Sequence, residues 1–328
     1  MTLWERVAEL PVEIEGLTVE RRELALASGW TRVTTTVLLH GGGETGAGED
    51  VTYDAPAQDG FPQPDLAGSY LLSQYSRLLD GAAIGGGDRD HRRWTFESAG
   101  LDLALRQSGL SLAAALGRDA EPVTFVVSTR QAIEEWLSLY PEQRFKVDAE
   151  RAWDEPAMAR IAATGAIDTV DLKAYYNGDF ADFPRDPKRY RLVAAAFPAA
   201  VLEDAWLGDG CREALEDAEA RLSFDAPIHS LADLDALPLD PRWLNVKPSR
   251  FGRAQELFEV IDACEQRGIR MYGGGQFELG PGRRQIQTLA SVLYPDTPND
   301  VAPSVYNEGG PRPGLPRSPL PPQEHIGF

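Results

Sequence analysis

The sequence contains few cysteines and no long apolar runs. Cys211 and Cys264 are the only two thiols in 328 residues, which is too few for a disulfide framework. Both lie in stretches with helical patterning, so we expect reduced thiols in a cytoplasmic protein. No apolar run approaches the ~20 residues that cross a bilayer, and the N-terminus lacks the basic-then-apolar order of a signal peptide. The sequence therefore predicts no membrane association.

Basic residues are also scarce relative to acidic ones. The chain has 32 Lys and Arg against 51 Asp and Glu, a formal net charge of −19. A surface of this sign repels phosphate backbones, so we expect no nucleic-acid partner. With 43% hydrophobic and 25% charged residues, the composition is that of a globular protein, and its length suggests two domains.

The first third of the chain has an α+β pattern. Within residues 12–54, β-branched residues alternate with period two, which predicts antiparallel strands. We assign glycines 41–43, with Gly46 and Gly48, to a hairpin turn before a second strand around 51–53. Helical patterning follows over 66–79 and 94–116. This order predicts an α+β domain over residues 1–120.

From residue 121 to 307, short apolar strands alternate with helical segments. Repeated βα units predict a parallel sheet, and about eight of them can close into a barrel. After residue 307 the chain becomes a Pro-rich tail, 308–328, with no core of its own. The expected strands are 123–128, 144–149, 169–176, 199–205, 221–230, 243–250, 269–278 and a weak last one at 300–306.

Charged residues stand where five consecutive barrel strands end. Active sites of parallel barrels lie at this end of the strands, and residues two apart on a strand share a face. A single buried charge is usually a paired structural ion, but five in series favour a functional site, because isolated buried charges are costly. Carboxylates from three adjacent strands suit Mg²⁺, and flanking lysines are the groups that move a proton next to a carboxylate. The residues are Lys146 and Asp148, Asp171 and Lys173, Glu203 and Asp204, Asp225, and Lys247.

Several runs resemble the enolase superfamily, nearest to the branch of muconate-lactonizing enzymes and o-succinylbenzoate synthases. The resemblance covers nearly the whole chain. It implies an α/β fold of enolase-like, two-domain architecture, with the α+β domain as a cap on a modified TIM barrel of the (β/α)7β type. The runs are TGAGEDVTY and FESAGLDLALRQSGLSLAAALG in the cap, and LEDA, NVKPSRFG, GGGQFELGPGRRQIQTLAS and PNDVAP in the barrel.

The resemblance also implies a function. Members abstract a proton α to a carboxylate through a metal-stabilised enediolate, so a Mg²⁺-dependent lyase or isomerase is expected, with Mn²⁺ as an alternative metal. The expected partner is a small carboxylate substrate, and homo-oligomers are common in such barrels. Position by position, the metal ligands fall on Asp171, Glu203 and Asp225, and the sixth-strand lysine on Lys247.

The second and third strands depart from this branch. It normally has Lys-x-Lys on the second strand and Asp-x-Asn on the third; here they read Lys146-Val-Asp148 and Asp171-Leu-Lys173. In one interpretation Lys173, paired with Asp148, replaces the missing lysine and opposes Lys247, with Lys146 as the other candidate base. In a second, Lys173 and Asp148 form a salt bridge in a catalytically silent barrel that binds a carboxylated ligand. In a third, Asp148 is the first metal ligand, although eight strands then leave 169–173 without a place.

Overall fold

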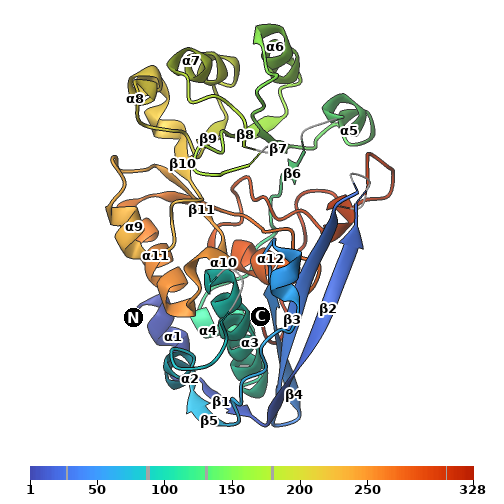
Figure 1. The fold of residues 1–328 in the computed structure, drawn as a ribbon, viewed down its shortest axis with the longest axis vertical. Coiled ribbons are helices and arrows are strands. Elements are labelled where there is room, and N and C mark those ends of the chain that lie inside the picture. Colours follow the sequence, from blue (N-terminus) through green and yellow to red (C-terminus); the bar gives the residue numbers. More distant parts are fainter. Residues whose placement is uncertain (27–28, 86–88, 130–131, 179–180, 308) are drawn as a thin grey trace.

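The computed structural model describes residues 1–26, 29–85, 89–129, 132–178, 181–307 and 309–328. Two parts are evident in Figure 1: long N-terminal strands with helices beside them, and a curled sheet with helices on its outside. This is the expected two-domain α/β architecture, with an α+β N-terminal part and a barrel-like C-terminal part.

An antiparallel sheet of order β2-β3-β4 forms the centre of the N-terminal part. Val33, Val37 and Leu39 are all buried, as the period-two pattern predicts for one face of a strand. A two-stranded ribbon of β1 and β5 pairs separately. The elements are α1 (Leu3–Val7), β1 (Pro11–Ile14), β2 (Gly16–Ala25), β3 (Thr31–Gly41), β4 (Glu44–Asp50), η1 (Ala55–Gln58), β5 (Gly68–Leu71), α2 (Leu72–Leu78), α3 (Arg89–Gln107) and α4 (Leu112–Leu116).

Gly46 and Gly48 lie inside strand β4, which corrects their assignment to the hairpin turn. Strand β4 starts at Glu44, well before the expected second strand around 51–53. Helix α3 lies directly on this strand. A Cβ on Gly46 would stand 2.3 Å from the carbonyl oxygen of Ala99, and one on Gly48 1.9 Å from that of Thr95. These glycines therefore serve close packing of helix on sheet rather than a turn.

The helices expected over 66–79 and 94–116 are each divided. In the first of these segments, residues 68–71 form strand β5, and helix α2 begins only at Leu72. The latter ends as α3 at Gln107, because Gly109 adopts a φ of +66° that terminates a right-handed helix. A separate short helix, α4, follows, with the Ser111 side chain accepting from the amide of Ala114 as its N-cap.

The C-terminal part is a parallel sheet of order β12-β11-β10-β9-β8-β7-β6. Its two edges meet through single parallel bridges, Phe125 to Asn299 and Gly274 to Asp300. The weak last strand expected near 300–306 is therefore reduced to these bridges, which close the curled sheet. The strands are β6 (Val127–Ser128), β7 (Phe145–Asp148), β8 (Ile167–Asp171), β9 (Val201–Glu203), β10 (Leu222–Phe224), β11 (Trp243–Val246) and β12 (Arg270–Gly273).

Helices cover the outside of the curled sheet (Figure 1). Helix α11 buries its apolar side, including Leu257, Val260 and Ile261, and Cys211 and Cys264 are buried free thiols. The elements are α5 (Ile133–Leu139), α6 (Glu155–Ala163), α7 (Pro187–Ala196), α8 (Cys211–Ala214), η2 (Glu216–Arg221), α9 (Leu231–Asp235), α10 (Pro248–Phe251), α11 (Ala254–Arg267), α12 (Pro281–Leu293) and η3 (Ser304–Asn307).

The Pro-rich segment 309–328 packs along both parts of the molecule. Leu320 forms an antiparallel bridge with Val123 at the start of the barrel. Phe328 is buried, contacts Trp94 edge to face and donates its amide to Asp102 of α3. Residues 309–328 therefore contribute buried side chains to the cores of the cap and the barrel.

Two buried charged residues join the cap to the barrel. The Arg32 guanidinium, on β3, donates to the carbonyls of Val51 and Thr52 in the cap and of Gln276 and Phe277 beyond β12. The Glu49 carboxylate accepts from three backbone amides of residues 279–282, at the start of α12. A carboxylate at a helix N-terminus satisfies amides that lack helical partners, so these contacts fix the cap over one side of the barrel.

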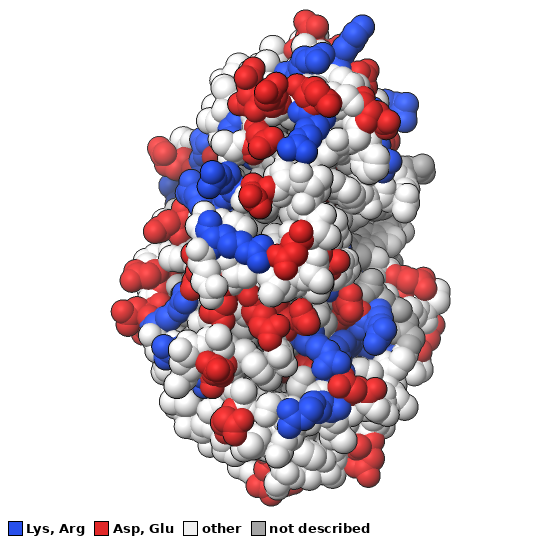
Figure 2. All heavy atoms as spheres, turned by 90° about the vertical axis from the view of Figure 1, so that its left-hand side faces the viewer, with Lys and Arg blue, Asp and Glu red and all other residues white. Residues whose placement is uncertain are grey.

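Acidic and basic side chains alternate over the face in Figure 2, without a large patch of one sign. In the described part of the chain, no helix has the length and hydropathy that a membrane span requires.

Candidate active site

The predicted charged residues meet at one rim of the curled sheet. Parallel strands bring their carboxyl ends to the same edge, and strands β7 to β11 are neighbours in the sheet. Strand β7, with Lys146 and Asp148, is second in the barrel, and β8, ending at Asp171, is third. The register in which Asp148 would occupy the third strand therefore does not match the observed strand order.

Lys146 lies among buried carboxylates. Its Nζ is 2.6 Å from Oε1 of Glu203 and 3.5 Å from Oδ2 of Asp171. Burial opposes the charge of Lys146, but Glu203, Asp171 and Asp300 together raise its pKa well above the usual value. Burial, opposed mainly by Lys146, raises the pKa of Glu203 to about 7. The oxygens of Glu203 also accept from Asn245 and Tyr272 inside the barrel.

Lys173 links Asp171 to Asp148. Its Nζ is 2.7 Å from Oδ2 of Asp171 and 3.1 Å from Oδ1 of Asp148. Burial opposes ionisation of Asp171, yet Lys173 and then Lys146 lower its pKa to about 2. Burial likewise opposes the charge of Lys173, but Asp171 and Asp148 raise its pKa above the usual range. Asp148 on the second strand and Lys173 after the third are the residues that differ from the usual pattern of this branch. The structure brings both into one ion-pair cluster.

Lys173 contacts Asp171 through a turn and not, as expected, from a neighbouring position on the same strand face. The two were expected to share a strand face, but β8 ends at Asp171 and Lys173 has a φ of +48°. Its amide donates to Oδ1 of Asp171 at 2.9 Å, which stabilises a turn in the left-handed region. The turn, rather than strand alternation, directs the ammonium back to the carboxylate.

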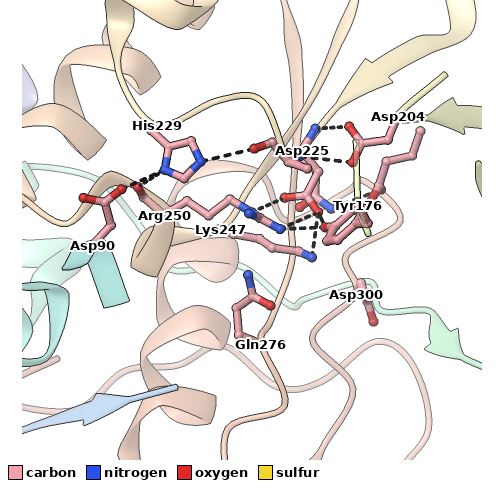
Figure 3. Close-up of polar contacts among 12 residues, drawn as sticks. Asp90, Tyr176, Asp204, Asp225, His229, Lys247, Arg250, Gln276 and Asp300 are labelled. Carbon is pink, nitrogen blue, oxygen red and sulfur yellow. Dashed lines mark hydrogen bonds and ion pairs between the residues drawn. The ribbon is translucent and has the colours of Figure 1, made fainter. Parts of the chain in front are cut away.

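Asp225 is held by two cations and a phenol (Figure 3). Its Oδ2 is 2.7 Å from Lys247 Nζ and accepts from the Tyr176 hydroxyl at 2.7 Å, while its Oδ1 accepts from Arg250 Nε at 2.8 Å. Burial opposes ionisation, but Arg250 and Lys247 hold the pKa of Asp225 well below its usual range. Sequence reasoning missed Arg250 and Tyr176. Arg250 could have been found, since it follows Lys247 by three residues in the short helix α10.

Asp204 joins the buried carboxylates. It has a φ of +52° and accepts from the backbone amides of Asp225, at 2.8 Å, and Ala226. Burial, followed by the negative charges of Asp225, Asp171 and Glu203, raises the pKa of Asp204 well above its usual value. Carboxylate oxygens of Asp171, Glu203 and Asp204 lie within 4.8 Å of one another. The structure therefore groups Asp204 with the two expected ligands, whereas Asp225 faces Lys247 and Arg250.

A cavity of about 820 Å³ opens at this rim between barrel and cap. Trp30 and Tyr53 line it from the cap. From the barrel it is lined by Lys146, Asp148, Lys173, Tyr176, Lys247, Gln276, Arg283 and Asp300, among others. In Figure 3, Asp225 lies on one side of the Lys247 ammonium, and Gln276 and Asp300 lie on the other side.

Three of the four lysines in the sequence line this one cavity. The fourth, Lys188, is an exposed residue of α7, and the other basic residues are arginines. Arginine stays protonated in proteins, whereas the pKa of a lysine responds to its surroundings. A site that concentrates the lysines is suited to proton transfer.

His229 connects this rim to the cap. Its Nδ1 is 2.8 Å from Oδ2 of Asp90 on α3 and 3.0 Å from the carbonyl of Arg250, and its Nε2 is 3.2 Å from the carbonyl of Ala226 (Figure 3). The hydrogen bond to Asp90 raises the pKa of His229 above its usual value, against the effect of burial.

Comparison with solved structures places the fold in the enolase class. The muconate lactonizing enzyme from Pseudomonas putida superposes with a TM-score of 0.68 at 16% identity, over 88% of each chain. A dipeptide epimerase from Methylococcus capsulatus, solved with a Mg ion, superposes with a TM-score of 0.66 at 20% identity, over 88% of this chain and 89% of that one. At these identities the likeness concerns the fold.

The chain belongs to the DUF8230 family. The N-terminal domain of this family, described as a domain of unknown function, matches residues 5–115, and its C-terminal domain matches residues 119–308. Among curated proteins, the N-succinylamino acid racemase of an Amycolatopsis species is 31% identical over 233 residues, 66% of this chain and 62% of the relative. The o-succinylbenzoate synthase of Bacillus subtilis strain 168 is 27% identical over 223 residues, 63% of this chain and 58% of the relative.

The match spans less than two thirds of the length of these curated relatives. Together, the relatives and the solved structures confirm the predicted resemblance to the enolase superfamily, in the branch of o-succinylbenzoate synthases and muconate-lactonizing enzymes.

Proposed function

We propose that this chain is a Mg²⁺-dependent enzyme that abstracts a proton α to the carboxylate of a small molecule. The observation that carries the proposal is the placement of Lys146, Lys173 and Lys247 around one cavity, beside buried carboxylates. Elimination, cycloisomerisation and epimerisation share the enediolate that this proton transfer forms, and the names of the relatives include a synthase and a racemase.

The buried carboxylates fit a divalent cation by their chemistry. Mg²⁺ prefers hard oxygen ligands, and Mn²⁺ accepts the same donors. Asp171 and Glu203 would hold the metal; the resemblance assigns the third ligand to Asp225, and the grouping of oxygens within 4.8 Å favours Asp204. A metal held there would supply positive charge that stabilises the oxygens of a developing enediolate.

Lys173 and Lys247 are proposed to exchange protons with the substrate from two sides of the cavity. Each is held by a carboxylate: Lys173 by Asp171 and Asp148, and Lys247 by Asp225. In its ion pairs Lys173 is an ammonium, which can donate a proton or bind a substrate carboxylate. Its pKa falls when the negative charge of Asp171 is engaged by another cation, and Lys173 can then accept a proton.

The proposed division of labour follows the domains. The barrel, 121–307, supplies the charged rim, and the cap, 1–120, closes one side of the cavity. Residues 309–328 of the tail, 308–328, pack against both. The substrate is proposed to be a small carboxylate, and the chain to act in the cytoplasm, with assembly into a homo-oligomer as a further expectation.

A second candidate is a catalytically silent barrel that binds a carboxylated ligand. The observation in its favour is the contact of Lys173 with both Asp148 and Asp171, which occupies the ammonium that proton transfer requires.

Exchange of α-protons with solvent separates the two candidates. The protein is incubated in D2O with Mg²⁺ and a set of N-acylamino acids, dipeptides and acid sugars, and loss of the α-proton signal is followed by NMR. Proton abstraction predicts exchange that disappears in Lys173→Met or Lys247→Met and persists in Lys188→Met, a control at the exposed lysine. Ligand binding without exchange in every case would support the silent barrel.

A further inference from the structure

Three aromatic side chains form one wall of the cavity that the lysines also line. Trp30 and Tyr53, from the cap, have ring centroids 6.1 Å apart and an interplanar angle of 17°. Phe277, from the loop after β12, lies with its centroid 6.1 Å from that of Trp30. All three line the cavity, and we call them the aromatic wall.

The aromatic wall keeps apolar surface exposed at the cavity. Trp30 is 40% exposed and Tyr53 48%, which places both among the few exposed large hydrophobic residues of the described chain. Exposed apolar surface in a concave site is a common sign of a binding surface, and flat rings bind other flat rings in offset or edge-to-face geometry.

Arg32 holds the aromatic wall in place from behind. Its guanidinium lies 4.3 Å from the centroid of Tyr53. Its four hydrogen bonds reach the carbonyl of the residue before Tyr53, Thr52, and that of Phe277 itself, so one buried side chain fixes the wall on both the cap and the barrel. Phe277 has a φ of +57°, a strained conformation for this residue type, and these bonds stabilise it.

The arginines beside the aromatic wall are already engaged. Arg32 is used by the four carbonyls, and Arg283 lies 2.9 Å from Oε2 of Glu278 and donates to the carbonyl of Ala302. Among the described residues, the Arg32 guanidinium donates to carbonyls and the charge of Arg283 is paired with Glu278, so neither guanidinium presents its full set of donors to a second carboxylate on the substrate. The lysines, in contrast, lie at the rim of the barrel, where the reacting carboxylate is placed by the proposed function.

We propose that the substrate carries an uncharged, flat unsaturated group, such as an aryl group, at the end distal to its reacting carboxylate, and that Trp30, Tyr53 and Phe277 bind this group. A cavity of about 820 Å³ lies within the usual size range of small-molecule sites and accommodates both ends of such a molecule. This inference rests on the proposed function, because that function places the carboxylate at the lysines.

Three matched probes test the proposal: N-benzoylalanine, N-acetylalanine and N-succinylalanine. They share the carboxylate and the α-proton and differ in the distal group, which is aryl, small or anionic. Their dissociation constants are measured by titration calorimetry with Mg²⁺ for the native chain, for Trp30→Ala, and for Leu192→Ala. Leu192, on α7, is 36% exposed and serves as a control of similar exposure.

We expect N-benzoylalanine to bind about tenfold tighter than N-acetylalanine, from ring contacts together with ring burial. N-succinylalanine should bind no tighter than the acetyl compound. Trp30→Ala should remove most of the benzoyl preference and leave binding of the acetyl compound unchanged, while Leu192→Ala should change neither. Circular dichroism checks that both variants fold.

Equal affinity for the benzoyl and acetyl probes, tightest binding of the succinyl probe, no measurable binding of the benzoyl probe, or a benzoyl preference that survives Trp30→Ala would each overturn the proposal. Exchange of the α-proton, followed in the same samples, tests the proposed function separately. A benzoyl preference without exchange supports the aromatic wall and contradicts proton abstraction, and exchange without the preference does the reverse.

Discussion

Replacement of Lys173 by Met should weaken catalysis and strengthen metal binding at the same time. The substitution removes the ammonium and keeps an unbranched side chain of similar length. Proton transfer by a positioned side chain contributes roughly 10²–10⁴-fold to a rate, so α-proton exchange should fall by about that factor.

The opposite effect on the metal follows from the contacts of the ammonium. Lys173 lies 2.7 Å from Asp171, and it is the strongest of the groups that lower the pKa of Asp171 to about 2. The lowered pKa means that the neighbouring ammonium groups favour the ionised carboxylate of Asp171. The same ammonium repels a divalent cation at Asp171. Its removal should tighten Mg²⁺ binding by about tenfold or more.

The variant should also be less stable without metal. Loss of one partner of a buried ion pair costs about 3–5 kcal/mol, because it leaves an uncompensated charge. Asp171 is fully buried and Asp148 largely so. Mg²⁺ should therefore raise the melting temperature more in Lys173→Met than in the native chain or in the exposed control Lys188→Met. Equal Mg²⁺ stabilisation in all three, or full exchange activity in Lys173→Met, would refute the reasoning.

Three further predictions follow from the contacts. If the grouping of oxygens persists on metal binding, Asp204→Asn should weaken Mg²⁺ binding by about tenfold or more in calorimetry, and Asp225→Asn less; the reverse order would assign the third ligand to Asp225. The pKa of His229 is raised by Asp90, so its contribution to stability should be complete below pH ~6.5 and lost as pH rises through the higher folded-state pKa. Urea unfolding of His229→Gln across this range should show a weaker pH dependence, and an unchanged profile would contradict the assignment. Arg32→Met should destabilise the fold by about 3 kcal/mol or more in urea unfolding, because four buried carbonyls lose a charged donor; a loss under 1 kcal/mol would contradict its role.

Much of the architecture could be predicted from local patterns. Period-two alternation around Val33 and Val37 marked a strand, and the rhythm of apolar runs from residue 121 marked the parallel strands. Errors arose where packing between elements decides. Gly46 and Gly48 resemble turn residues in the sequence, yet they lie in a strand. Glycine is needed there because helix α3 approaches too closely for a Cβ.

The charged rim could be predicted because strand direction alone brings the ends of parallel strands together. Lys146, Asp171, Glu203, Asp225 and Lys247 were found in this way. Arg250 follows Lys247 closely enough in the sequence to be expected near Asp225, but partners such as Tyr176 and Asn245 could not be found, since a contact between strands depends on side-chain direction and on loops.

The sequence by itself therefore determined the fold class and the set of ionisable groups at the barrel rim. The hydrophobic period of each segment and the succession of strands along the chain can be read directly from the residues. The pairing of Lys173 with Asp148 was expected from the sequence and is observed, but only the tertiary structure decided how the other groups pair. A left-handed turn directs Lys173 to Asp171 and Asp148, and α10 brings Arg250 to Asp225. Arg32 joins the cap to a loop more than two hundred residues away. Such contacts depend on side-chain direction and on packing between segments distant in sequence, which residue periodicity does not encode.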